Sequence, residues 1–266
     1  MKKVLLSLAV MTAVTTGYAQ KMLVLYYSET GTTKTVAEEL QKQLNADIEA
    51  IEAIEPYSGN FQETIKRGQH EMQSGDWPAL KLLKKNIADY DIIFLGYPIW
   101  FGTYANPIVT LVQENDFAGK TVVPFCTFGS GGLNTSTEAL KKALPKATVK
   151  NGYGVRAARV TAAPKELDRF LKENGYKEGT VEKLPDYSNQ QPLTAHERQM
   201  FEAACSSYQF PLGTPVSVGK RKTPDSLDYK YTVTGRGMNG EETTSIIYVT
   251  VPDADRNHPE FTEVVR

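Results

Sequence analysis

Apolar runs alternate with amphipathic stretches along residues 22–174 of the chain. Short continuous apolar runs at 22–27, 91–97 and 121–128 predict buried strands. An alternating run at 47–54 and a weaker run at 149–155 predict two more. Apolar positions three or four apart predict helices, at 32–44, 106–114, 134–144 and 164–174, with a longer polar stretch at 60–83 broken at Gly75 and Pro78. Strands this apolar are typical of parallel sheets buried on both faces. The alternation therefore predicts an α/β fold, a doubly wound five-stranded parallel sheet.

The pattern changes after Tyr176. Residues 177–192 are polar, contain two prolines and predict a linker, so the first domain spans 20–176. Thr194 and Glu197 have the spacing of a capping box and predict the start of a helix. Alternating runs at 215–221, 227–235 and 243–251, with a short run at 261–265, predict strands. Residues 193–266 are therefore expected to form a small α+β module of unknown role, folded independently and dispensable for ligand binding by the first domain.

The N-terminal segment 1–19 has the pattern of a secretory signal peptide. A basic start at Lys2 and Lys3 precedes a mostly apolar run, and small residues flank Tyr18 before Gln20. The run is shorter than the ~20 residues that a transmembrane helix needs, so no transmembrane segment is expected. The alternative is a buried first strand or helix. The signal interpretation predicts cleavage after Ala19 and an exported protein, periplasmic or secreted.

The composition is that of an ordinary globular protein and points to no nucleic-acid or metal site. Hydrophobic residues at 41% and charged residues at 23% are ordinary for a globular protein. The net charge of −1 gives no indication of nucleic-acid binding. The contexts of Cys126 and Cys205 predict two separate buried thiols, although export would permit a disulfide. The three histidines have no metal-ligand spacing, and the oligomeric state stays open.

A turn rich in hydroxyl groups, residues 28–33, joins the first strand to the first helix. A helix N-terminus offers free N–H groups and a partial positive charge, and Ser and Thr hydroxyls add donors. Such a turn can hold a phosphate without a lysine, and Lys34 already lies on the predicted helix. The alternative is a plain helix cap. Glu29, inside the turn, is expected to point its side chain to solvent.

Two further loops follow strands three and four. "GYPIWFGTYANP", 96–107, places Trp100 and Phe101 at the carboxyl end of a strand, where open α/β sheets bind ligands. "CTFGSGGL", 126–133, supplies a loop rich in backbone groups. A phosphate turn, an aromatic plate and a glycine-rich edge together predict an FMN site. Gly102 would let the Phe101–Gly102 peptide turn its C=O toward the flavin N5–H.

Residues 22 to about 175 resemble the flavodoxin-like family. The resemblance rests on "LVLYYSETGTTKTVAEEL", "DIIFLGYPIWFGTYANPI", "GKTVVPFCTFGSGG" and "KELDRFLKENGY". It implies a sheet of order 2-1-3-4-5 and non-covalent FMN. The cofactor-binding residues that it implies form three groups: Ser28, Thr30, Gly31, Thr32 and Thr33 for the phosphate; Pro98, Ile99, Trp100, Phe101 and Gly102 for one flavin loop; and Thr127, Phe128, Gly129 and Gly132 for the other.

The leading hypothesis is an exported FMN-binding redox protein that carries out electron transfer. No catalytic side chain and no metal are expected, because the flavin carries the chemistry. The expected partner is a redox protein or a small quinone-like acceptor. One alternative is an FMN-dependent NAD(P)H quinone or nitro-compound reductase, and another is a non-redox envelope binding protein on the same scaffold.

Overall fold

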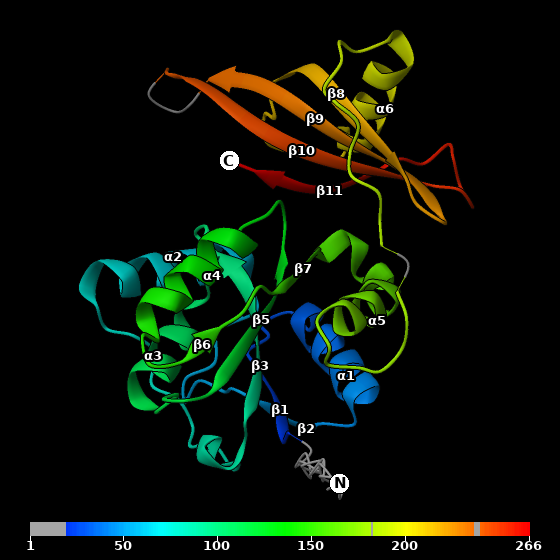
Figure 1. Cartoon of the computed structure of the whole chain (residues 1–266). Coiled ribbons are helices and arrows are strands. Elements are labelled where there is room, and N and C mark those ends of the chain that lie inside the picture. The colour runs from blue at the N-terminus through cyan, green and yellow to red at the C-terminus, as the bar shows by residue number, and fades with distance from the viewer. Residues whose placement is uncertain (1–19, 182, 237–239) are drawn as a thin grey trace, which may run out of the picture.

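The computed structural model describes residues 20–181, 183–236 and 240–266, and the predicted signal peptide lies outside these ranges. Figure 1 shows an α/β domain with a second, antiparallel sheet above it. The two meet where β5 (Thr121–Phe128) ends, because Val264 of the upper sheet donates its N–H to the carbonyl of Ser130. Among the described residues, none of the helices has the length and hydropathy required to span a bilayer.

The lower sheet has the expected doubly wound topology. Its other strands are β1 (Met22–Tyr26), β2 (Asp47–Ala50), β3 (Ile92–Trp100), β4 (Thr103–Tyr104), β6 (Thr148–Val149) and β7 (Tyr153–Arg156). The order is β2-β1-β3-β5, with β6 and β7 both pairing with β5, and all these pairs are parallel. The short β4 folds back antiparallel on the end of β3. The fold class and the strand order predicted from the sequence are therefore confirmed.

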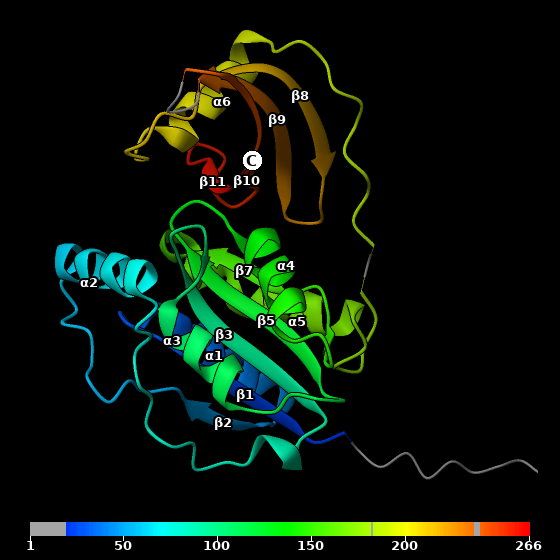
Figure 2. The same ribbon diagram turned by 90° about the vertical axis from the view of Figure 1, so that its left-hand side faces the viewer.

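Helices cover both faces of this sheet. They are α1 (Thr32–Leu44), α2 (Phe61–Ser74), α3 (Asn106–Glu114), α4 (Leu133–Ala143) and α5 (Ala163–Glu173), with 3-10 turns at Ile87–Asp89 and Ala157–Ala162. Leu23 and Leu25 of β1 join the core that includes α3 and α4, whereas Val24 joins the core that includes α1 and α5. Figure 2 shows the same layering from the side. Burial on both faces explains why β1, β3 and β5 are continuously apolar.

The fifth predicted strand is split into β6 and β7. The break lies beside Pro124 of β5, which has no N–H to donate to a ladder. Gly152 lies in the break, and a Cβ at this position would lie 2.2 Å from the Pro124 carbonyl oxygen. The second strand is also shorter than predicted, ending at Ala50, although Ile51 and Ala53 remain buried.

The C-terminal module contains α6 (Ala195–Cys205), β8 (Thr214–Lys222), β9 (Ser226–Arg236), β10 (Glu242–Pro252) and β11 (Glu260–Val265). The sheet order is β11-β10-β9-β8, and all pairs are antiparallel. The predicted capping box of Thr194 and Glu197 is confirmed. Helix α6 packs on one face of the sheet, where the Phe201 and Tyr231 ring centroids are 5.1 Å apart.

Part of the predicted linker lies along β8. Gln191 forms a bridge with Val218, and Ser188 donates its N–H to the carbonyl of Lys220. The Tyr187 ring lies against Tyr248, with centroids 5.9 Å apart. The segment 187–191 therefore adds an irregular edge to the module's sheet, although its sequence is polar and contains no apolar run.

The two cysteines are free, as predicted. Cys126 is fully buried in β5, and Cys205 is partly buried at the end of α6. Burial raises the pKa of both thiols, that of Cys205 to about 12. Both therefore stay protonated and unreactive near neutral pH.

Gly96 provides a test of packing in the sheet core. A Cβ at this position would lie 2.1 Å from the Phe125 ring on the adjacent strand. We expect Gly96→Ala to lower the free energy of unfolding by about 1–3 kcal/mol, because the core is overpacked there. Urea unfolding followed by circular dichroism measures this change. Adding Phe125→Leu should restore part of the loss, and if the two substitutions are simply additive the steric explanation is wrong.

Candidate functional site

The first turn, Ser28–Thr33, leaves the N-terminus of α1 open. Gly31 has φ 89° and starts the helix, and no side chain caps it. Among the described residues, no protein group accepts from the backbone N–H of Thr32 or Thr33, whereas the N–H of Lys34 donates to Ser28 Oγ at 3.1 Å. Thr30 is exposed beside these groups. Two free N–H groups with hydroxyls around them fit an anion.

Thr33 also has a structural role. Its hydroxyl is 2.8 Å from that of Thr127, and both residues are buried. The two side chains therefore brace the first turn against the end of β5. Contacts of these two residues with a cofactor stay a prediction.

Glu29 does not simply point to solvent. Its carboxylate accepts a hydrogen bond from Tyr27 Oη at 2.7 Å and from the N–H of Gly59 at 2.9 Å. The expectation of a solvated side chain was wrong, because two donors, one of them thirty residues away, hold it. The two bonds fix the direction of this carboxylate, which is tied to Tyr27 and to the backbone of Gly59.

The second loop is a strand end and a tight turn, where the sequence suggested an open loop. Strand β3 continues through Trp100, which pairs with Thr103 across the two-residue turn Phe101–Gly102. Phe101 has φ 51° and Gly102 has φ 82°, the combination found in type I′ hairpin turns. The Thr103 hydroxyl beside this turn is buried and has no partner among the described residues. A buried unpaired hydroxyl next to a predicted ligand site is an available hydrogen-bonding group.

Trp100 is held by two tyrosines. Its ring meets Tyr27 edge-on at 5.7 Å between centroids, and Tyr57 at 4.9 Å. Tyr57 in turn donates to Glu71 at 2.6 Å, and Arg67 lies 4.0 Å from the Tyr57 ring centroid. Sequence reasoning missed this support, because its members come from the residue after β1, from α2 and from the segment between β2 and α2. Phe101 is separate from it: the ring is 41% exposed and lies over α2 at Gly68, where a Cβ would be 2.9 Å away.

The third loop, 127–132, follows β5. Phe128 is buried in the core, whereas Gly129 has open space around its Cα. Gly132 has φ 121°, and a Cβ there would lie 2.8 Å from the side chain of Ile99, so this loop packs on the end of β3. Pro98 accepts from the N–H of Ala105 and is half-buried. The structure thus brings the three predicted loops to one edge of the sheet.

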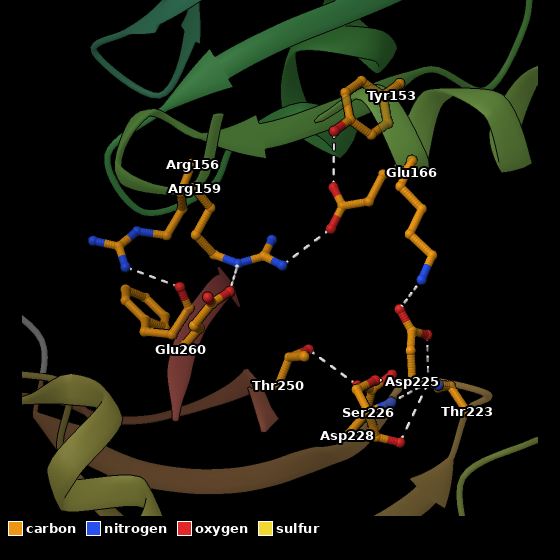
Figure 3. A network of polar contacts seen from close by, with 12 residues as sticks. Tyr153, Arg156, Arg159, Glu166, Thr223, Asp225, Ser226, Asp228, Thr250 and Glu260 are labelled. Atoms are coloured by element: carbon orange, nitrogen blue, oxygen red, sulfur yellow. Dashed lines mark hydrogen bonds and ion pairs between the residues drawn. The ribbon is translucent and has the colours of Figure 1, made fainter. Parts of the chain in front are cut away.

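An open cavity of about 830 Å³ lies between this domain and the module. Figure 3 shows its polar network, in which Arg159 bonds both Glu166, at 3.0 Å, and Glu260, at 2.7 Å. Of the residues predicted to bind the cofactor, only Phe128 lines this cavity. The cavity is therefore a feature between the domains, and none of the residues of the first turn lines it.

Glu263 of β11 lines the same cavity without a partner. No hydrogen bond or ion pair to it is present among the described residues, and its Cγ would lie 3.4 Å from a Cβ at Gly131. Burial raises its pKa to about 7. The buried thiol of Cys126 and the phenol of Tyr248 lie close enough for the Glu263 charge to raise their pKa values. Near pH 7 both groups are neutral, so neither supplies a positive charge opposite the Glu263 carboxylate.

Glu263 should make the stability of the protein pH-dependent. Its folded pKa of about 7 lies above the ordinary value of 4.5, so the folded state is favoured when the carboxyl is protonated. This contribution is complete below pH 4.5 and is lost as the pH rises through 7. We expect Glu263→Gln to match wild type at pH 4.5 and to be more stable by about 1–3 kcal/mol at pH 8. Urea unfolding at both pH values measures the difference. An equal difference at the two pH values would contradict the titration.

Comparison with known proteins gives the family. The flavodoxin family model matches residues 21–171, more than half of the chain. A candidate flavoprotein from Bacteroides uniformis ATCC 8492 is 29% identical with a TM-score of 0.51, covering 57% of this chain and 99% of that chain. A candidate flavoprotein from Bacteroides eggerthii DSM 20697 is 33% identical with a TM-score of 0.48, covering 56% of this chain and 99% of that chain.

A flavoprotein from Lactobacillus acidophilus NCFM, solved in complex with FMN, is 24% identical with a TM-score of 0.46, covering 55% of this chain and 99% of that chain. No match was found among the curated proteins. The family match ends at residue 171, before the C-terminal module begins. Through its first domain, with the strand order and the three loops described above, the chain belongs to the flavodoxin family.

Proposed function

We propose that this protein binds FMN where β1, β3 and β5 end and uses it for electron transfer outside the cytoplasm. The observation that carries the proposal is the open N-terminus of α1, with two free N–H groups and no cation inside the turn. Membership of the flavodoxin family supports FMN as the cofactor. Export rests on the N-terminal sequence pattern alone.

The residues of the three loops fit the parts of FMN. The phosphate would be held by the N–H groups of Thr32 and Thr33, with the hydroxyls of Ser28, Thr30 and Thr32 as further donors. The isoalloxazine would lie between the Trp100 hairpin and the 127–132 loop, whose Ser130, Gly131 and Gly132 N–H groups have no acceptor among the described residues. When bound, the flavin supplies one- or two-electron redox chemistry. The protein supplies binding, orientation and shielding.

The partner of this chemistry is part of the proposal. A redox protein or a small quinone-like compound would exchange electrons with the flavin. A second candidate function, NAD(P)H-dependent reduction of quinones or nitro compounds, is favoured by the turn at Phe101–Gly102. Reversing that peptide would leave Phe101 at positive φ in the conformation of the first central residue of a type II′ turn, a position for glycine.

The sequence-based expectation that Gly102 alone frees this peptide is therefore incomplete. Phe101 opposes the reversal by about 1–3 kcal/mol, the usual energy of a side chain in a glycine conformation. A peptide that is disfavoured from turning would keep its carbonyl away from a flavin N5–H, so this turn favours the reductase over the one-electron carrier.

The phosphate contacts are tested with two ligands. We expect Thr32→Ala and Thr30→Ala to weaken FMN binding about tenfold to a hundredfold, because each removes a hydroxyl donor to a charged acceptor. Riboflavin lacks the phosphate and should bind the variants as it binds wild type. Quenching of flavin fluorescence measures both affinities. Thr35→Ala is the matched control, since its hydroxyl bonds the carbonyl of Gly31 on the same helix.

Equal losses for FMN and riboflavin in Thr32→Ala would show that the turn is only a helix cap. A wild-type protein that binds neither ligand, whether apoprotein or freshly purified, would overturn the proposed function.

The number of electrons transferred at a time is tested at Phe101. We expect Phe101→Gly to separate the first and second flavin reduction potentials by on the order of 50–100 mV more than in wild type, because glycine permits the reversed peptide. Phe101→Ala removes the ring but keeps the backbone restriction, and it should resemble wild type. Spectroscopic redox titration gives both potentials. Well-separated potentials in wild type would favour the carrier over the reductase.

A further inference from the structure

The glycine-rich loop after β5 is contacted from outside by the C-terminal module. The N–H of Val264 in β11 donates to the carbonyl of Ser130 at 2.8 Å. A Cβ at Gly131 would lie 2.3 Å from the carbonyl oxygen of Val264. Backbone therefore lies directly on backbone, and only glycine at 131 allows β11 to come this close.

Arg156, at the end of β7, ties the same two segments together. Its Nε donates to the carbonyl of Gly129 at 2.7 Å, and its Nη1 donates to the carbonyl of Phe261 at 2.9 Å. The guanidinium also lies 4.3 Å from the Phe261 ring centroid. Figure 3 shows Arg156 reaching toward β11 beside Arg159. One side chain thus bonds a loop of the first domain and a strand of the module at once.

On the side of the loop, these contacts use backbone carbonyls. The carbonyls of Gly129 and Ser130 are bonded toward Arg156 and β11, whereas the N–H groups of Ser130, Gly131 and Gly132 have no acceptor among the described residues. A loop of small residues has high conformational entropy when free. Fixing the carbonyls of Gly129 and Ser130 fixes the two peptides to which they belong, and thus the direction of the Ser130 and Gly131 N–H groups.

We propose that β11 and Arg156 form a clamp on the 129–132 loop, so that the C-terminal module is a working part of the flavin site. Arg156 is a positioning residue: it orients the loop that meets the isoalloxazine and does not itself contact the flavin. This inference rests on the proposed function and replaces the sequence-based expectation that the module is dispensable for cofactor binding.

Two further contacts hold the module on the first domain. Arg159 of the first domain bonds Glu260 of β11, and Lys165 of α5 bonds Asp225 of the module. Neither pair touches the 129–132 loop. They hold the two domains together. Arg156 then holds the loop in a fixed place relative to β11, because it bonds both.

The first measurement needs no flavin. Backbone ¹⁵N order parameters of residues 129–132 are compared in the full-length apoprotein, Arg156→Ala and Arg156→Lys. We expect them to fall from about 0.85 to below about 0.6 in both variants, since lysine lacks the planar fork with which the guanidinium bridges two carbonyls. Glu260→Gln is the matched control, because it breaks an interdomain ion pair away from the loop, and it should leave the order parameters of 129–132 unchanged.

The second measurement is affinity. FMN and riboflavin should both bind Arg156→Ala about tenfold more weakly, because the loop meets the ring that the two ligands share. This pattern differs from that of Thr32→Ala, which discriminates between the ligands. Gly131→Ala disrupts the clamp from the loop side, because its Cβ would clash with the Val264 carbonyl. It should cause the same loss of affinity, and it replaces Arg156→Ala if that variant fails to fold.

Unchanged order parameters and unchanged affinity in both Arg156→Ala and Gly131→Ala would overturn the clamp. Wild type that binds no flavin would instead overturn the proposed function, and the order parameters would still decide whether the module holds the loop.

Discussion

Everything in the candidate site depends on one geometric constraint: parallel strands of a sheet end at the same edge. Strands β1, β3 and β5 are neighbours in the sheet, although about seventy and thirty residues separate them along the chain. Because each is buried on both faces, the register among them is strongly fixed. The turns that follow them therefore meet, and the Thr33–Thr127 hydroxyl pair joins two of them directly. A phosphate turn, an aromatic hairpin and a glycine-rich loop therefore form one site because of the sheet topology, and not because of interactions between residues that are close in the sequence.

The sequence predicted the features that local chemistry determines. Helix α1 begins and ends at the predicted residues, because a hydroxyl-rich turn precedes it and Asn45 in a left-handed conformation ends it. The 2-1-3-4-5 order was implied by the resemblance to the flavodoxin-like family and is confirmed. The hairpin at Phe101–Gly102 was not predicted, because phenylalanine is a rare first residue of a type I′ turn and only the completed pairing of Trp100 with Thr103 imposes it.

Long-range contacts were beyond the reach of sequence patterns. Tyr57 and Glu71, which support Trp100, lie in polar segments with no distinctive motif. Arg156 reads as one more charged residue after a weak strand, and its two carbonyl partners are 27 and 105 residues away. The module's sheet was predicted from its alternation, yet alternation says nothing of where β11 docks. Docking depends on the glycine at 131, which could equally have served a turn.

The isolation of the two cysteines has a consequence for how the chain can mature. Cys126 is enclosed in the centre of the first domain and Cys205 belongs to the second, so neither stabilises the fold through a covalent link. The native state therefore has the same covalent structure in an oxidising and in a reducing compartment. Its folding needs no oxidase or isomerase, and wrong pairing requires both domains to be open at once. Such a protein can cross from one redox environment to another without a change in the interactions that hold it folded.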